Sequence, residues 1–316
     1  MAGTETVCLS FRDGTAGGEE NQSMEVRTVK YADRQGNRWE EESLQDRFLE
    51  KIYGSRLGRA AARVLAAPVV SRIGGRLLET RASRLLIPGF VKRNRLDPGE
   101  WEARSFASFN DFFTRKAAPG MRPQDPEEDV LISPCDGRLL VSPVTGQGRF
   151  LIKHTGYTAA QLLRSHRLAR RFYGGWALIF RLTVQDYHRF CYVDDAARSS
   201  TRRIAGCFHT VNPAANDAQP IYKENTREYC LLHTRHFGTV LMMEVGALLV
   251  GKIENYHGAG TVRRGQEKGR FAFGGSTVVL LVEPGKVMMD RDILENSRDG
   301  FETLVKMGQR IGKAAG

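Results

Sequence analysis

The second half of the chain is a series of short apolar runs separated by glycine and proline. Runs of this length, bounded by turn residues, are typical of β-strands. Because few long helical patterns lie between them, they favour antiparallel sheets over alternating strand–helix units. The predicted strands cover residues 130–133, 138–144, 149–153, 176–182, 204–211, 229–233, 239–245, 248–253 and 277–282, with one short helix at 159–170.

The first part of the chain has a different pattern. Between residues 49 and 86 apolar side chains recur at spacings near three and four, which predicts amphipathic helices. Ser43–Asp46 and Ser108–Asp111 each have the form of a capping signal that opens a helix. A linker with three prolines in ten residues, 117–126, then divides the helical part from the strands.

These patterns predict an α+β protein, with N-terminal amphipathic helices followed by a mainly antiparallel β core. We expect three regions along the chain. They are a disordered leader at 1–38, a basic helical segment that associates with membranes at 39–116, and a β-rich core that carries the chemistry at 117–316.

Most of the net charge is concentrated in the helical part. The chain has 47 Lys and Arg against 36 Asp and Glu, a net charge of +11. Residues 51–95 hold eleven basic side chains and one acidic one, Glu79, so this segment contributes +10. Basic amphipathic helices are typical of membrane-surface binding, and the alternative is a helical cap with solvated arginines. Nucleic acid is not an expected partner, because aromatic residues are too sparse in this segment for base stacking.

The location of the protein follows from the same pattern. No window approaches the roughly 18 to 20 apolar residues that a spanning helix needs, and the first 35 residues lack the pattern of a signal peptide. We therefore expect a peripheral protein at the cytoplasmic face of a cell membrane, without a transmembrane helix. The five cysteines are scattered and the histidines show no ligand spacing, so we expect neither a disulfide framework nor a metal.

Three short motifs are candidates for chemistry. In Gly274–Thr277, the Ser276 hydroxyl could attack the preceding carbonyl of Gly275 if a strained turn presents it, because glycine permits unusual dihedrals. The alternative is a glycine bulge in a strand. Asp136 lies in an Asp-Gly turn, which is either a plain hairpin or a carboxylate that orients a histidine. His188 follows a predicted strand and is either a general base or a structural histidine.

In this order, and with their surroundings, the motifs resemble the phosphatidylserine decarboxylases. The resemblance covers the chain from about residue 42 to its end. The matching segments are SFNDFFTRK at 108–116, PGMRP at 119–123, SPCDG at 133–137, IKHTGY at 152–157, DYHR at 186–189, EVGA at 244–247, GKI at 251–253, KGRF at 268–271, FGGST at 273–277 and KMG at 306–308.

The resemblance implies a proenzyme that cuts its own chain between Gly275 and Ser276. Ser276 attacks the Gly275 carbonyl and converts the amide to an ester. Elimination then leaves a dehydroalanine that hydrolyses to a pyruvoyl group and ammonia. The products are a β chain of residues 1–275 and an α chain of residues 276–316. The only cofactor is this covalently bound pyruvate, which the chain makes from its own Ser276.

The implied reaction converts phosphatidylserine to phosphatidylethanolamine and CO2. The pyruvoyl ketone forms a Schiff base with the substrate amine and accepts the electron pair as CO2 leaves. By matching to the family, His188 takes the proton of Ser276 and Asp136 holds the imidazole tautomer. The implied partners are the α and β chains of one precursor, the lipid substrate in an anionic membrane surface, and a second copy of the chain.

The sequence departs from the best-known family pattern at Cys191. A second histidine stands there in that pattern, and some members use it as the base for cleavage. We assign the role to His188, because a cysteine cannot serve as an imidazole.

Two other functions stay open on the sequence alone. One is a pyruvoyl-dependent decarboxylase of another serine phospholipid, and the other is a non-catalytic membrane-surface binding module.

Overall fold

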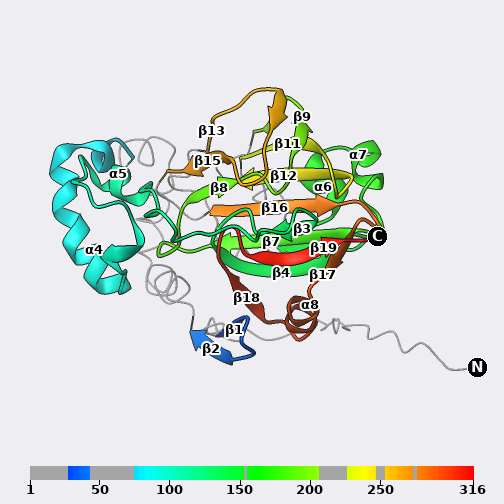
Figure 1. Ribbon diagram of the computed structural model, residues 1–316, viewed down its shortest axis with the longest axis horizontal. Helices are drawn as coiled ribbons and strands as arrows, with labels where there is room; N and C mark the ends of the chain where they lie inside the picture. Colours follow the sequence, from blue (N-terminus) through cyan, green and yellow to red (C-terminus); the bar gives the residue numbers. More distant parts are fainter. Residues whose placement is uncertain (1–27, 43–74, 153–154, 206–225, 247–252, 273–275) are drawn as a thin grey trace, which may run out of the picture.

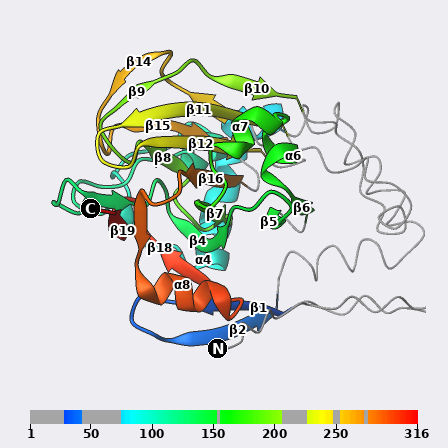
Figure 2. The same cartoon turned by 90° about the vertical axis from the view of Figure 1, so that its right-hand side faces the viewer.

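The computed structural model describes residues 28–42, 75–152, 155–205, 226–246, 253–272 and 276–316. Its centre is an eleven-stranded sheet whose strand pairs are antiparallel except for β1 and β18, which run parallel. Figure 2 shows this sheet extending from β14 at one end to β2 at the other. In spatial order its strands are β14 (Gly260–Val262), β9 (Ala196–Arg198), β11 (Arg227–Thr234), β12 (Thr239–Val245), β16 (Ser276–Val282), β7 (Trp176–Leu182), β4 (Gly137–Pro143), β18 (Glu302–Val305), β1 (Thr28–Ala32) and β2 (Arg38–Glu42), with β10 (Arg202–Ile204) beside β11.

Smaller sheets and helices accompany the large sheet. The smaller sheets are β13 (Ile253–Asn255), β15 (Glu267–Phe271) and β8 (Arg189–Cys191); β17 (Val287–Met289), β19 (Arg310–Ala314) and β3 (Val130–Ile132); and β5 (Phe150–Ile152) with β6 (Thr155–Tyr157). The first two share one hydrophobic core with the even-numbered residues of β16, such as Val278 and Leu280. The odd-numbered residues pack in a second core with α6 (Ala159–Leu163). Because both faces of β16 are covered, its sequence is apolar almost throughout.

A helical region lies at one end of the molecule, where Figure 1 shows α4 and α5. It contains η1 (Arg81–Leu86), α4 (Ile87–Asn94), η2 (Pro98–Glu100) and α5 (Phe109–Phe113). The buried rings of Phe109, Phe112 and Phe113 hold it together, and partly buried apolar side chains from α4 and its neighbours pack against them. The predicted capping signal is present, because the Ser108 hydroxyl accepts a hydrogen bond of 3.1 Å from the Asp111 amide.

The predicted fold class is confirmed, but two details of the prediction are wrong. The leader was expected to extend to residue 38, yet residues 28–42 form the β1–β2 hairpin, and β1 pairs with β18 near the C-terminus. The predicted helix at 159–170 is two helices, α6 and α7 (His166–Arg170), because Arg164 adopts a left-handed conformation with φ of 47° and Ser165 caps a new helix.

Other predictions lie outside the described residues. These are the leader at 1–27, the capping signal at Ser43–Asp46, the basic helices at 43–74, and parts of the strands predicted at 204–211 and 248–253. Within the predicted helical segment, residues 39–42 belong to strand β2, and the described helical elements begin at residue 75.

Candidate active site

The three predicted site residues are brought to one end of the large sheet. Ser276 is the first residue of β16 and pairs with Leu182, the last residue of β7. On the other side of β7, strand β4 begins at Gly137, directly after Asp136. Figure 1 shows β16, β7 and β4 side by side at the centre of the sheet. The chain leaving β7 turns at residues 183–186 and reaches His188 before β8.

Ser276 lies in an enclosed part of the sheet. Its side chain is fully buried, and every residue of β16 is buried with it. The register between β16 and β7 runs without a shift from Ser276 to Val282. The two hydroxyl residues therefore begin the strand and do not interrupt it. Gly274 and Gly275 lie outside the described residues.

The imidazole of His188 is held in one tautomer. Its Nε2 lies 3.0 Å from the carbonyl oxygen of Thr183. Because a carbonyl oxygen can only accept, Nε2 carries the proton and donates it, and Nδ1 keeps the basic lone pair. Nδ1 is buried and has no hydrogen-bond partner in the part of the chain that the structure describes. The ring also stacks on Phe113, with the two centroids 4.0 Å apart.

His188 is neutral at physiological pH. Only 1% of its surface is exposed, and burial lowers its pKa to about 4. The nearby Asp186 carboxylate opposes this shift, whereas the Arg115 guanidinium adds to it. A neutral imidazole with a free, buried lone pair is the state that a general base requires.

A short turn fixes the carbonyl that orients His188. The Thr183 hydroxyl donates a 2.9 Å hydrogen bond to Asp186, and the Thr183 amide donates to the same carboxylate oxygen. Arg138 of β4 pairs with Asp186 from the neighbouring strand. The sequence prediction missed the role of Thr183, because a backbone carbonyl carries no signature in the sequence.

Asp136 does not hold His188, contrary to the sequence prediction. Its carboxylate accepts three hydrogen bonds of 2.7–3.0 Å from Arg122 and one of 2.9 Å from the Met307 amide. Burial raises the pKa of Asp136, and Arg122 opposes that shift. The carboxylate therefore fastens the turn before β4 to the linker and to the C-terminal segment. The Thr183 carbonyl takes over the tautomer role.

Cys191 cannot replace the second histidine of the family pattern as a base. It lies on β8, and its amide donates a 2.8 Å hydrogen bond to the Pro134 carbonyl, two residues before Asp136. Burial raises the pKa of its thiol to about 12, so the thiol stays protonated at neutral pH. Of the two positions, only His188 offers a basic lone pair.

Two further properties of the described residues concern metal binding and membrane spanning. They contain no group of three or more His, Cys, Asp or Glu side chains that could hold a metal ion. None of the helices among them combines the length and the apolar character needed to cross a membrane.

Comparisons with known proteins identify the family of the chain. Residues 109–313 match the family model described as phosphatidylserine decarboxylase. The chain is 42% identical over 266 residues to the phosphatidylserine decarboxylase proenzyme 2 of Clostridium acetobutylicum, covering 84% of this chain and 91% of that protein. It is 38% identical over 296 residues to the phosphatidylserine decarboxylase proenzyme of Chlamydia caviae, covering 92% and 99%. The chain therefore belongs to the phosphatidylserine decarboxylase family, whose members are carboxy-lyases of phospholipid biosynthesis, made as proenzymes.

Proposed function

We propose that this chain cuts itself between Gly275 and Ser276 and then decarboxylates phosphatidylserine to phosphatidylethanolamine. The observation that carries the proposal is the neutral, buried imidazole of His188 at the end of the sheet where Ser276 begins β16. The names of the relatives support the same reaction, because they are phosphatidylserine decarboxylase proenzymes.

The self-cleavage step uses side chains that the chain already holds in place. The lone pair of His188 Nδ1 takes the proton of the Ser276 hydroxyl as the Ser276 oxygen attacks the Gly275 carbonyl carbon. The proton then passes to the Ser276 nitrogen as its bond to that carbon breaks, so the amide becomes an ester. His188 is locked by Thr183 and Phe113, which keeps Nδ1 in one orientation during both transfers.

The residues around Ser276 fit a pyruvoyl group made from it. The group would stand at the first position of β16, which β7 and β12 flank, in a fully buried place. Leu182, which pairs with Ser276, is followed by Thr183, whose carbonyl orients His188. A pyruvoyl group supplies a ketone that serves as an electron sink for decarboxylation. Pairing with β7 and β12 would hold the new α-chain N-terminus. His188 Nδ1 would take a proton from the substrate ammonium as the amine reacts, and would return it to the product carbon.

A decarboxylation assay tests the proposed function. Purified protein mixed with vesicles containing phosphatidylserine should release CO2 and form phosphatidylethanolamine in equal amounts. Vesicles with a different serine-headgroup phospholipid, tested in parallel, separate the alternative substrate from this one. A protein that binds the vesicles but releases no CO2 from either lipid would instead be the non-catalytic binding module.

The membrane surface is proposed to meet the helical region. Three leucines project into solvent there: Leu77 is 60% exposed, Leu85 80% and Leu86 55%. Arg81 and Arg84 are exposed between them, and none of these residues has a carboxylate partner in the described part of the chain. A surface that combines exposed leucines with free arginines suits an anionic lipid bilayer.

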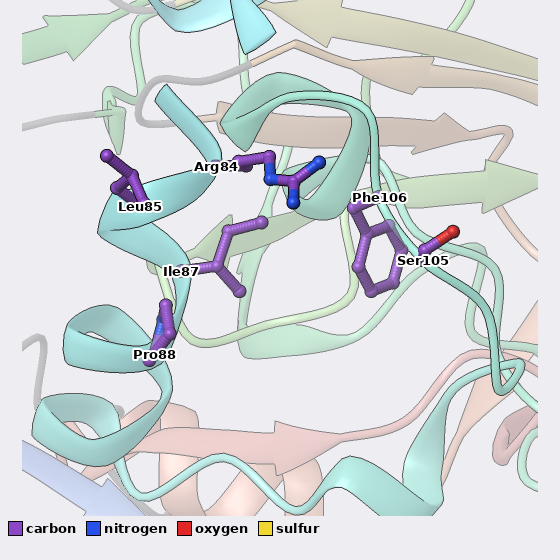
Figure 3. A pocket seen from close by; sticks show the side chains of 6 residues that line it. All are labelled: Arg84, Leu85, Ile87, Pro88, Ser105 and Phe106. Carbon is purple, nitrogen blue, oxygen red and sulfur yellow. The ribbon is translucent and has the colours of Figure 1, made fainter. Parts of the chain in front are cut away.

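A surface pocket of about 380 Å³ lies in the same region. In Figure 3, Arg84 and Ile87 reach from the η1–α4 side toward Phe106 on the facing segment. The pocket gives the leucine-rich surface an apolar hollow beside a cation. This arrangement supports contact with lipid chains below the headgroups.

Removing the exposed leucines should release the protein from membranes. We expect the double change Leu85→Ser and Leu86→Ser to weaken sedimentation with phosphatidylserine vesicles by about 10- to 100-fold, because two apolar side chains no longer enter the bilayer. Met288→Ser is the matched control, since Met288 is 57% exposed but lies on β17, outside the helical region. Equal sedimentation of the double variant and the control would contradict this assignment of the surface.

A further inference from the structure

Arg115 is a buried cation that forms no ion pair with any described residue. It follows α5, and only 6% of its surface is exposed. The guanidinium carbon lies 5.0 Å from the ring centroid of Trp101 and 4.9 Å from that of Phe112. Within the described residues, Nη1 is buried without a hydrogen-bond partner and the side chain has no ion pair. Burying an unpaired charge costs free energy, and a bound anion would offset this cost. The buried, unpartnered guanidinium nitrogen therefore indicates a binding site for an anionic ligand.

The neighbouring carboxylates already form salt bridges with other residues. Glu100 and Asp136 both act electrostatically on Arg115. However, both carboxylates are bound by Arg122, at 3.0 Å and 2.7 Å from its Nη2. Glu100 also pairs with Lys306 at 3.4 Å, so the two cations Arg122 and Lys306 balance these two acids. The positive charge of Arg115 is then left available for an anion from outside the chain.

Arg115 belongs to the same site as His188. Phe112, which stacks on its guanidinium, is followed by Phe113, which stacks on the His188 ring. Arg189, next to His188, donates hydrogen bonds of 2.9 Å and 3.2 Å to the carbonyls of Thr114 and Arg115. The segment that carries Arg115 is thus fastened directly to the segment that carries His188.

We propose that Arg115 binds the phosphodiester of the phospholipid substrate. This inference rests on the proposed function, which supplies a substrate with two anionic groups, a carboxylate and a phosphodiester. The carboxylate leaves as CO2, so an ion pair with it would be stronger in the ground state than in the transition state and would slow the reaction. The phosphodiester is unchanged by the reaction, and the planar fork of a guanidinium matches its oxygens. Trp101 is only partly buried and its ring lies against the planar guanidinium, so the indole should move when the phosphodiester binds.

Kinetics give the first test. For Arg115→Gln we expect KM for phosphatidylserine to rise about 10- to 100-fold, the usual effect of losing hydrogen bonds to a charged group. We expect kcat to change by less than about threefold, because the interaction is the same in ground and transition states. Arg104→Gln is the matched control. Arg104 also stacks on a ring, that of Phe106 at 4.7 Å, but it is paired with Asp111 and its side chain is 39% exposed.

Arg115→Lys guards against a purely structural effect. An ammonium keeps the charge but not the fork, so KM should rise less than in Arg115→Gln. Both variants should still cut themselves completely and unfold at temperatures close to that of the unmodified protein. A fall in kcat with unchanged KM in both variants would overturn the proposal.

Binding of soluble headgroups gives the second test and does not need an active enzyme. In a Ser276→Ala background, glycerophosphoethanolamine carries the phosphodiester without the carboxylate, and free serine carries the carboxylate without the phosphodiester. We expect glycerophosphoethanolamine to change the fluorescence of Trp101, and Arg115→Gln to weaken that binding at least about tenfold. The change in fluorescence should be lost in Trp101→Phe, which identifies Trp101 as its source.

The outcomes separate this inference from the proposed function. Equal binding of glycerophosphoethanolamine with and without Arg115 would overturn the phosphodiester site, and so would a loss of serine binding alone. If binding depends on Arg115 but the self-cut protein releases no CO2, the proposed function fails while the phosphodiester site stands.

Discussion

A Ser276→Ala variant is expected to stay a single chain of 316 residues and to lose decarboxylase activity by about 10⁴-fold or more, as when the nucleophile of a covalent catalyst is removed. Alanine has no hydroxyl to attack the preceding carbonyl, and it leaves no atom from which a ketone could form. The substitution should not unfold the protein, because β16 is apolar and buried on both faces and alanine keeps its pairing with β7. A denaturing gel and the CO2 assay measure the two effects.

The control for this variant is Ser142→Ala, which removes a hydroxyl from β4, in the same sheet but toward the other end of the strand. It should cut itself and decarboxylate as the unmodified protein does. Activity that survives in Ser276→Ala, with or without a cut chain, would disprove the role of Ser276.

Replacing His188 with asparagine is expected to slow self-cleavage by about 10²- to 10⁴-fold, the usual contribution of a general base. Freshly made protein should therefore accumulate as the uncut chain, which a time course on a denaturing gel measures. His236→Asn is the matched control, since the Nδ1 of His236 contacts the Asp194 carboxylate at 3.1 Å and His236 has no part in the proposed reaction. Cleavage of His188→Asn at the normal rate would rule out His188 as the base.

The pH dependence of self-cleavage should follow the protonation of His188. Because the pKa of His188 is lowered to about 4, its lone pair is available throughout the neutral range and is lost only as pH falls through that value. The unfolded chain binds this proton already below about pH 6.5, so folding stability should fall by about 3 kcal/mol as pH drops from 6.5 to 4. In His188→Asn this part of the acid sensitivity should be missing from the free energy of unfolding.

The central strands of the fold could be predicted because their sequences are predominantly apolar. Strands β7, β12 and β16 are continuous apolar runs, and their burial on both faces explains why the predicted bounds are met within one residue. The hairpin β1–β2 could not be found in the same way. Its β2 strand has the sequence RWEEE, and β1 gains its pairing from β18, about 270 residues further along the chain.

The sequence led to three candidate residues that the structure places at one end of the large sheet, but it did not predict their hydrogen-bond partners. Ser276, Asp136 and His188 were singled out by the resemblance of their ordered motifs to a known family, and their catalytic roles stay predictions. The group that orients His188 is the Thr183 carbonyl, which any residue could supply, and so the sequence favoured Asp136 instead. The true partner of Asp136, Arg122, lies in a proline-rich linker where an arginine gives no sign of a buried ion pair.

The intact mass of the purified protein tests the central claim most directly. Self-cleavage between Gly275 and Ser276 predicts two species: a chain of residues 1–275, and a chain of residues 276–316 that is lighter by one ammonia than the same peptide with an N-terminal serine. A single species at the full mass of 35.4 kDa, or a second chain that still begins with an unmodified serine, would contradict the account.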